Sequence, residues 1–359
     1  MSGAPLRFTY QALPMRVLFR PGALAALAGE LDALGLRRVL VLSTPGQEAT
    51  ARAVARTLGD RAAGIHPHAV MHVPVEVARR ARDAAGAAGA DGCVAVGGGS
   101  TIGLGKAVAL QHGLPVVAVP TTYAGSEMTP IWGLTEQGAK RTGRDPRVLP
   151  RSVVYDPELT LSLPARVSAA SGLNAVAHAV EALYAPDASP IVSLMAEEGV
   201  RAFSAALPAI ARAPRDLAAR GTALYGAWLC GACLGATTMS LHHKLCHILG
   251  GTLDLPHAET HAVVLPYVLA YNAGSAPAAV AALRRALDTD DPALALQELG
   301  GRLGTPRSLG ELGVRAEDLD RVVEQVVASP SANPREFTRE DLRALLEAAL
   351  DGRPVTPAA

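Results

Sequence analysis

Histidines are concentrated in one short stretch of this sequence. Five of the ten lie between positions 242 and 261, namely His242, His243, His247, His257 and His261. Histidine serves as a metal ligand and, because imidazole titrates near neutral pH, as a general acid or base. His243 and His247 are four residues apart, a spacing that places both rings on one face of a helix. The sequence therefore predicts a cluster with a chemical role.

Other polar residues join this cluster by their spacing. Asn174 and His178 lie one helical turn apart on a separate predicted helix. His257 follows Gly250-Gly251, which we interpret as a break, so we expect two helix faces and a loop to converge. Lys244 lies inside the cluster as well, and the resemblance given below makes it the candidate partner for a substrate carboxylate. A lone histidine on an apolar face is usually a core residue, but here the spacing repeats.

A run of glycines follows a predicted buried strand and opens a predicted helix. Its candidate ligand-binding residues are Gly97, Gly98, Gly99, Ser100 and Thr101. Without a Cβ, such a turn brings backbone N–H groups and a helix N-terminus close to a phosphate. The run matches neither the G-x-G-x-x-G fingerprint nor the P-loop, because Lys106 is followed by Ala107. A tight turn that only packs the helix on the sheet is therefore the alternative.

A second polar loop follows the next predicted strand. Its candidate donors to phosphate, ribose or carboxamide are Thr121, Thr122 and Ser126. Loops at the carboxyl ends of parallel strands are where open α/β sheets bind nucleotides, although Ser and Thr also cap turns. Ser43 follows an earlier strand, where no acidic residue is present to hold a ribose 2′-hydroxyl and repel a 2′-phosphate. We therefore expect either NADH or NADPH as the cofactor.

These residues lie in two regions with different periodicity. Up to residue 157, β-branched runs alternate with helical stretches, which is typical of an open parallel sheet covered by helices. The predicted strands are residues 39–42, 92–96, 115–120 and 153–155, and the helices between them are 21–34, 47–58 and 75–89. Later predicted helices are 164–184, 191–213, 216–237, 277–287, 292–299 and 339–350. We predict an α/β Rossmann-like domain over residues 1–157 and an all-helical domain over residues 158–359.

Composition excludes several classes of protein. A chain of 359 residues with 49% apolar side chains exceeds what one core usually holds. Lys plus Arg (33) balances Asp plus Glu (33), so no nucleic-acid partner is expected. No apolar run reaches the roughly 18 residues of a membrane span, and no signal peptide is recognisable. Cys230 and Cys233 lie in a predicted buried helix, so neither a disulfide framework nor a redox motif is indicated. We expect a cytoplasmic protein without a membrane partner.

Longer strings at these sites resemble a known family. They are GGGSTIGLGK at 97–106, PTTYAGSEMTPIW at 120–132, SGLNAVAHAVE at 171–181, HHKLCHILGG at 242–251 and PHAETH at 256–261. They are similar to the iron-containing alcohol dehydrogenase superfamily and, within it, to the maleylacetate reductase subgroup. The resemblance implies the dehydroquinate synthase-like fold of that superfamily and a homodimer. It also implies an NAD(P)-binding α/β half, a helical half and an active site in the cleft between them.

The resemblance also bears on the metal. In metal-dependent members an Asp and three His hold iron or zinc, and the matching positions here are Asn174, His178, His243 and His257. Since an amide and three imidazoles are all neutral, they bind a divalent cation less firmly than a set with a carboxylate. We therefore expect no metal. The superfamily's glycine loop usually has an Asp where Gly103 stands here, which changes the nicotinamide end of the site.

The resemblance implies NAD(P)H-dependent reduction of the conjugated double bond of maleylacetate, or of a substituted analogue, to 3-oxoadipate in aromatic-compound catabolism. The substrate is a small unsaturated keto dicarboxylate, and hydride addition places negative charge on its ketone oxygen. Hydrogen-bond donors replace the Lewis acid in this hypothesis. They come from His178, His243, His257 and Asn174. His247 is the candidate to deliver the proton, directly or through water, or else it only positions the nicotinamide.

Three alternatives stay open. The first is a metal-dependent alcohol or aldehyde oxidoreductase, in which three histidines bind zinc or iron despite Asn174, and metal content distinguishes it. The second is a lyase resembling dehydroquinate synthase, which uses NAD only transiently, so net NADH turnover excludes it. The third is a catalytically silent homologue that binds nucleotide. In that case, substitution of His247 or His178 leaves any turnover unaffected.

Overall fold

The computed structural model describes residues 8–136, 139–329 and 331–356. Contacts divide the chain into two compact units. The α/β unit contains Pro14–Pro164 and Arg212–Gly231, and the helical unit contains Met1–Leu13, Ala165–Ala211 and Ala232–Ala359. Each unit is discontinuous in sequence, because Ala165–Ala211 separates the two segments of the α/β unit and these segments interrupt the helical unit. Helix α7 (Leu217–Ala236) begins in the α/β unit and ends in the helical unit. The single domain boundary after residue 157 stays a prediction.

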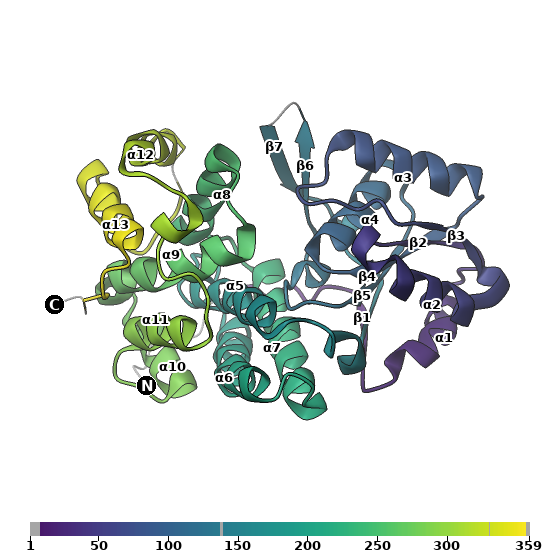
Figure 1. The fold of residues 1–359 in the computed structure, drawn as a ribbon, viewed down its shortest axis with the longest axis horizontal. Coiled ribbons are helices and arrows are strands. Elements are labelled where there is room, and N and C mark those ends of the chain that lie inside the picture. The colour runs from purple at the N-terminus through teal and green to yellow at the C-terminus, as the bar shows by residue number, and fades with distance from the viewer. Residues whose placement is uncertain (1–7, 137–138, 330, 357–359) are drawn as a thin grey trace. The chain divides into compact units, whose positions relative to one another are not determined.

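A six-stranded parallel sheet forms the centre of the α/β unit, in the order β1-β8-β5-β4-β2-β3 (Figure 1). Its strands are β1 (Arg16–Phe19), β2 (Val39–Leu42), β3 (Ala62–His66), β4 (Gly92–Gly97), β5 (Val116–Pro120) and β8 (Ser152–Tyr155). The predicted strands are all present, and the predicted fold class is confirmed. The sequence analysis did not predict β1 and β3, which form the two edges of the sheet and are less buried than the central strands.

Helices cover both faces of this sheet (Figure 1). On one face, Val41, Val94 and Val117 pack against α1 (Leu27–Ala33) and α2 (Glu48–Leu58). On the other face lie α4 (Gly99–His112) and its neighbour α3 (Val75–Ala87). Gly105 of α4 lies close to Val116 and Ala95. Because both faces are covered, β2, β4 and β5 are buried at every position, as is usual for parallel strands.

A separate hairpin follows the loop after β5. It consists of β6 (Ile131–Glu136) and β7 (Ala139–Arg144), which pair antiparallel. The sequence pattern did not indicate either strand of this hairpin. The strand β7, AKRTGR, has no alternating apolar residues, so its pairing with β6 left no periodic signal.

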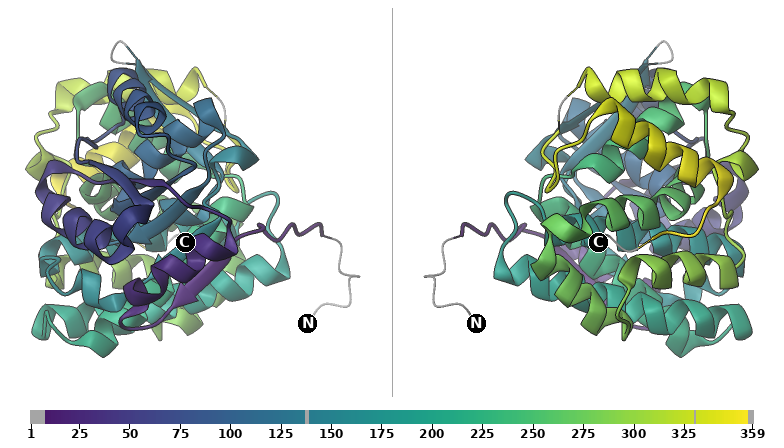
Figure 2. Two further views of the ribbon diagram at one scale, coloured as in Figure 1. Left: turned by 90° about the vertical axis from the view of Figure 1, so that its right-hand side faces the viewer. Right: turned by 90° about the vertical axis from the view of Figure 1, so that its left-hand side faces the viewer.

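The described part of the helical unit contains helices and turns but no strand (Figure 2). The helices are α5 (Ala165–Leu183), α6 (Pro190–Arg212), α8 (Leu241–Leu253), α9 (His257–Asn272), α10 (Pro277–Leu287), α11 (Pro292–Arg302), α12 (Leu319–Val327) and α13 (Arg339–Asp351). Helix α5 is buried from Ser168 to Leu183 and packs against α9. No single described helix is long and apolar enough to cross a membrane; only α7 and α8 joined across a sharp bend meet that test.

The connection between α8 and α9 differs from the expectation. Gly250 and Gly251 do not break the chain, because α8 continues through them to Leu253. The turn lies instead at Asp254, which adopts the left-handed conformation with φ of 52°. His257 is consequently not a loop residue but the first residue of α9. Neither glycine has a positive φ, so their presence alone was a misleading signal.

Candidate active site

Three helices of the helical unit bring the predicted histidines together. His178 comes from α5, His243 and His247 from α8, and His257 from the start of α9. The ring centroids of His178 and His243 are 4.9 Å apart. The ring centroid of His247 lies 6.1 Å from that of His243 and 6.1 Å from that of His257. With His242 and His261, these residues form what we call the histidine cluster.

His261 lies at the centre of the cluster, although the catalytic donors proposed from the sequence did not include it. Its ring centroid is 4.4 Å from that of His257 and 4.9 Å from those of His242 and His243. His261 Nδ1 lies 2.9 Å from His242 Nε2. Burial, and then the neighbouring imidazoles, lower the pKa of His261 and of His242 well below the usual range. Both rings are therefore neutral. In the sequence, the spacing of four residues between His257 and His261 indicated that the two rings share a helix face.

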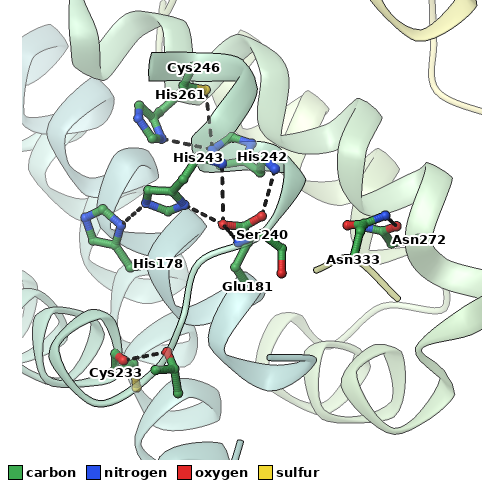
Figure 3. Close-up of polar contacts among 11 residues, drawn as sticks. His178, Glu181, Cys233, Ser240, His242, His243, Cys246, His261, Asn272 and Asn333 are labelled. Carbon is green, nitrogen blue, oxygen red and sulfur yellow. Dashed lines mark hydrogen bonds and ion pairs between the residues drawn. The ribbon is translucent and has the colours of Figure 1, made fainter. Parts of the chain in front are cut away.

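Glu181 is a second residue that the sequence pattern did not indicate. Its carboxylate is fully buried and accepts hydrogen bonds from the backbone N–H of His242 (2.7 Å) and of Ser240 (3.0 Å). It also lies 2.6 Å from His243 Nδ1. On the other side of that ring, His243 Nε2 lies 2.7 Å from His178 Nδ1 (Figure 3). His243 therefore uses both ring nitrogens within the protein.

Asn174 and Lys244 carry buried polar atoms available to a ligand. Asn174 is 3% exposed, and its Oδ1 has no hydrogen-bond partner among the residues that the structure describes. Lys244 Nζ is likewise buried and has no hydrogen-bond partner among the described residues. Desolvation lowers the pKa of Lys244. Because an unpaired buried polar atom costs free energy, a ligand that satisfies these atoms gains from doing so.

A divalent cation fits these donors poorly. Ring nitrogens of His242, His243 and His261 lie within 4.8 Å of one another, which is within reach of one ion. However, His243 Nε2 is at hydrogen-bond distance from His178, as is His242 Nε2 from His261, so these nitrogens already pair with each other. Asn174 offers only a neutral oxygen, and Glu181 is engaged by backbone N–H groups. The set therefore lacks a free anionic ligand.

The glycine loop joins β4 to α4 in the α/β unit. Gly97 ends β4, Gly98 is the N-cap of α4, and Gly99 is its first residue. A Cβ on Gly97 would lie 2.7 Å from Gln47 Oε1, and one on Gly98 would lie 2.9 Å from Thr122 Oγ1. Among the residues that the structure describes, no side chain caps this helix. Its first N–H groups and the positive end of its dipole thus suit an anion such as a pyrophosphate.

The other predicted cofactor residues differ in exposure. Thr101 and Ser43 are fully buried, and across the described ranges their hydroxyl oxygens have no hydrogen-bond partner. Thr121 is also buried and accepts a hydrogen bond from Gln47 Nε2 at 2.6 Å. These three hydroxyls lie within the protein, and Gln47 was not indicated by the sequence pattern. The predicted hydroxyl residues that stay partly exposed are Ser100, Thr122 and Ser126.

A buried lysine holds Ser126. Lys106 on α4 is 1% exposed, and its Nζ donates to the backbone oxygen of Ser126 (2.6 Å), to Thr129 Oγ1 (2.8 Å) and to the backbone oxygen of Ile131 (2.8 Å). Burial lowers the pKa of Lys106 to about 7, while the charge of the neighbouring Glu127 acts in the opposite direction. Lys106 therefore ties the loop after β5 to the helix that the glycine loop opens.

Known proteins resemble the chain over nearly its whole length. Residues 14–157 match the iron-containing alcohol dehydrogenase model, and residues 168–350 match the model for the C-terminal part of the Fe-containing alcohol dehydrogenase family. The maleylacetate reductase of Burkholderia cepacia is 56% identical over 345 residues, which cover 96% of this chain and 98% of that protein. The maleylacetate reductase of Sphingobium indicum is 54% identical over 349 residues, covering 97% and 99%.

A solved structure agrees with these sequence matches. The crystal structure of maleylacetate reductase from Agrobacterium tumefaciens matches with a TM-score of 0.94 at 54% identity, and the match covers 97% of this chain and 99% of that one. Both family models and both halves of the fold point to the same assignment. This chain belongs to the iron-containing alcohol dehydrogenase family.

Proposed function

We propose that the chain is an NAD(P)H-dependent oxidoreductase that reduces the conjugated double bond of maleylacetate, or of a substituted analogue, to 3-oxoadipate. Full-length relatives named maleylacetate reductase, 52% to 56% identical to this chain, support the substrate class. The uncapped N-terminus of α4 after three glycines supports a dinucleotide cofactor. Within this proposal the enzyme is a cytoplasmic homodimer. Analytical ultracentrifugation of the purified protein tests the oligomeric state.

The chemistry requires the protein to meet a developing negative charge. When bound, the reduced nicotinamide supplies a hydride, which adds to the carbon β to the ketone. Hydrogen-bond donors of this site stabilise the resulting enolate oxygen. They are the Asn174 amide and imidazole N–H groups of the histidine cluster other than those of His178 and His243, which are directed to His243 and Glu181. His247 then delivers a proton to the α carbon, directly or through water. Lys244, whose Nζ has no partner in the described chain, pairs with one substrate carboxylate.

The neutral donor set is the observation that carries this proposal. By the resemblance, Asn174 occupies the position at which metal-dependent members have an Asp. Ring nitrogens of His178 and His243 pair with each other, as do those of His242 and His261. Preorganised neutral donors in a buried site stabilise an oxyanion without a cation, because low local polarity strengthens each hydrogen bond. We therefore propose that reduction by this chain does not require a metal ion.

Removal of metal is expected to leave the activity intact. The protein is treated exhaustively with a chelator, residual iron and zinc are measured by mass spectrometry, and NADH oxidation with maleylacetate is followed by absorbance. Activity that is lost with the metal and returns only when zinc or iron is restored contradicts the proposal. Treated wild-type protein that has been reloaded with zinc serves as the control for damage by the chelator.

Restoring the carboxylate is expected to create a metal site. In Asn174→Asp, an anionic oxygen joins the imidazoles, so the affinity for zinc should rise by at least about tenfold. Maleylacetate reduction should fall several-fold in the metal-free variant, because a carboxylate near the enolate repels the developing charge. Zinc titration of the variant beside the wild type measures the first effect and steady-state kinetics the second. Equal zinc affinity in the two proteins would show that position 174 does not control metal binding.

A metal-dependent alcohol or aldehyde oxidoreductase is the second candidate. The proximity of His242, His243 and His261 ring nitrogens favours it, since three imidazoles hold catalytic zinc in other folds. Under this alternative the zinc-loaded or iron-loaded protein reduces simple aldehydes, and the metal-free protein reduces nothing. A comparison of maleylacetate and a simple aldehyde on both forms separates the two functions.

A further inference from the structure

We propose that Glu181 is a positioning residue that fixes which ring nitrogens of His243 and His178 carry protons. The inference deepens the proposed function and rests on it for its catalytic consequence. Glu181 lies at the C-terminal end of α5, one turn after His178, and its side chain is fully buried. Nothing in the spacing of the histidines themselves requires a carboxylate at this place.

Glu181 first supplies the cap of α8. Ser240 is the N-cap residue, but its own side chain makes no capping bond. The backbone N–H groups at the start of α8 find their acceptor on another helix, α5. Those of Ser240 and His242 donate to the two carboxylate oxygens of Glu181 at 3.0 Å and 2.7 Å. The carboxylate thus sets where α8 begins, and with it the positions of the histidines on that helix.

Glu181 also determines the tautomer of His243. Both of its oxygens already accept backbone N–H groups, so the contact of 2.6 Å with His243 Nδ1 is made by a ring N–H donor. In the neutral ring, a proton on Nδ1 leaves Nε2 with a lone pair. That lone pair accepts the hydrogen bond from His178 Nδ1 across 2.7 Å.

The tautomer of His178 follows from that of His243. With its proton on Nδ1, the neutral ring of His178 carries a lone pair on Nε2. His178 therefore accepts a hydrogen bond at that atom and orients a proton donor, whereas the Asn174 amide and the other imidazole N–H groups meet the enolate oxygen. One buried carboxylate thereby determines which ring nitrogens donate and which accept, first in His243 and then in His178 (Figure 3).

Glu181→Gln separates this role from packing. The amide keeps the shape of the side chain and one acceptor oxygen for the N-terminus of α8, but its NH₂ group faces His243 Nδ1. A donor at that place favours the Nε2–H tautomer of His243. The matched control is Asp187→Asn, because Asp187 accepts hydrogen bonds from the backbone N–H and the hydroxyl of Thr238 (2.9 and 2.8 Å). Asp187 anchors the same connection before α8 without a contact to the cluster.

The test combines nitrogen NMR of ¹⁵N-histidine-labelled protein with steady-state kinetics, and the His243 signals are assigned by their loss in His243→Gln. We expect the Nδ1–H tautomer of His243 in the wild type and in Asp187→Asn, and the Nε2–H tautomer in Glu181→Gln. We expect kcat for maleylacetate to fall at least about tenfold in Glu181→Gln, with the KM for NADH unchanged, as for other residues that orient a catalytic imidazole.

Each outcome decides the proposal. An Nε2–H tautomer in the wild type overturns it, whether or not Glu181→Gln folds. Unchanged kcat in a Glu181→Gln protein with a switched tautomer also overturns it, as does an equal loss of kcat in Asp187→Asn. If the wild type does not reduce maleylacetate at all, the proposed function fails, and the NMR measurement still decides the tautomer separately.

Discussion

Replacement of His178 by alanine is expected to lower kcat for maleylacetate reduction by about a hundredfold, the loss typical of a residue that takes part in proton transfer. His178 is 3% exposed, contacts His243, and lies one turn from Asn174 on α5. Its removal leaves the proton donor without an oriented partner. The KM for NADH should be unchanged, because the predicted cofactor residues belong to the α/β unit. Steady-state kinetics at varied NADH and maleylacetate measure both constants.

His178→Asn is the control for loss of packing. An asparagine amide can still donate from near the position of Nδ1 to His243, but it has no group at the position of Nε2. A comparable loss of kcat in both variants, with little change in the thermal unfolding midpoint of His178→Asn, assigns the effect to Nε2. Retention of wild-type kcat by His178→Asn would mean that the ring only fills space and holds His243.

Replacement of Gly99 by alanine is expected to raise the KM for NADH by at least about tenfold, equivalent to about 1.4 kcal/mol of binding free energy. A Cβ at this position fits the protein itself, since the nearest atom is Ala124 Cβ at 3.8 Å. Its only obstacle would be a phosphate that approaches the N–H groups at the start of α4. The rise in KM therefore reports the pyrophosphate site directly.

Gly86→Ala is the matched control for this substitution. Gly86 lies within α3, and a Cβ there meets no atom of the described chain within 4 Å. Alanine in a helix interior stabilises the protein by about 0.5–1 kcal/mol, without a ligand being involved. We expect unchanged KM for NADH in Gly86→Ala, and no loss of thermal stability in either variant. Equal KM values for wild type and Gly99→Ala would place the cofactor phosphates elsewhere.

The local elements of this chain follow from its sequence because their causes are local. Strands β2, β4 and β5 are buried on both faces, so they read as continuous apolar runs. The glycine loop could be found because close approach of backbone to side chains excludes a Cβ there. His243 and His247 share a helix face because their spacing matches the helical repeat.

Other elements were not predicted because they depend on contacts between parts of the chain that are distant in sequence. β7 pairs with β6 through its backbone, and its sequence AKRTGR has no alternating apolar residues. β1 lies at the edge of the sheet, with one exposed and three partly buried residues, so it differs from the fully buried central strands. The glycine pair in α8 and the turn at Asp254 show the same limit. A glycine permits a break but does not require one, and the packing of α8 and α9 decides where the chain turns.

The amino-acid sequence by itself determined the fold class and indicated the histidines proposed for the site, but not Glu181. The tertiary structure alone decided which atoms of those residues meet. Glu181 reaches His243 across 62 positions of the sequence, and Lys106 reaches Ser126 across 20. Buried polar groups need partners, but any helix or loop that folds against them can supply these. The pairing of nitrogens and oxygens, and hence the chemistry of the cluster, therefore arises only when the helices pack.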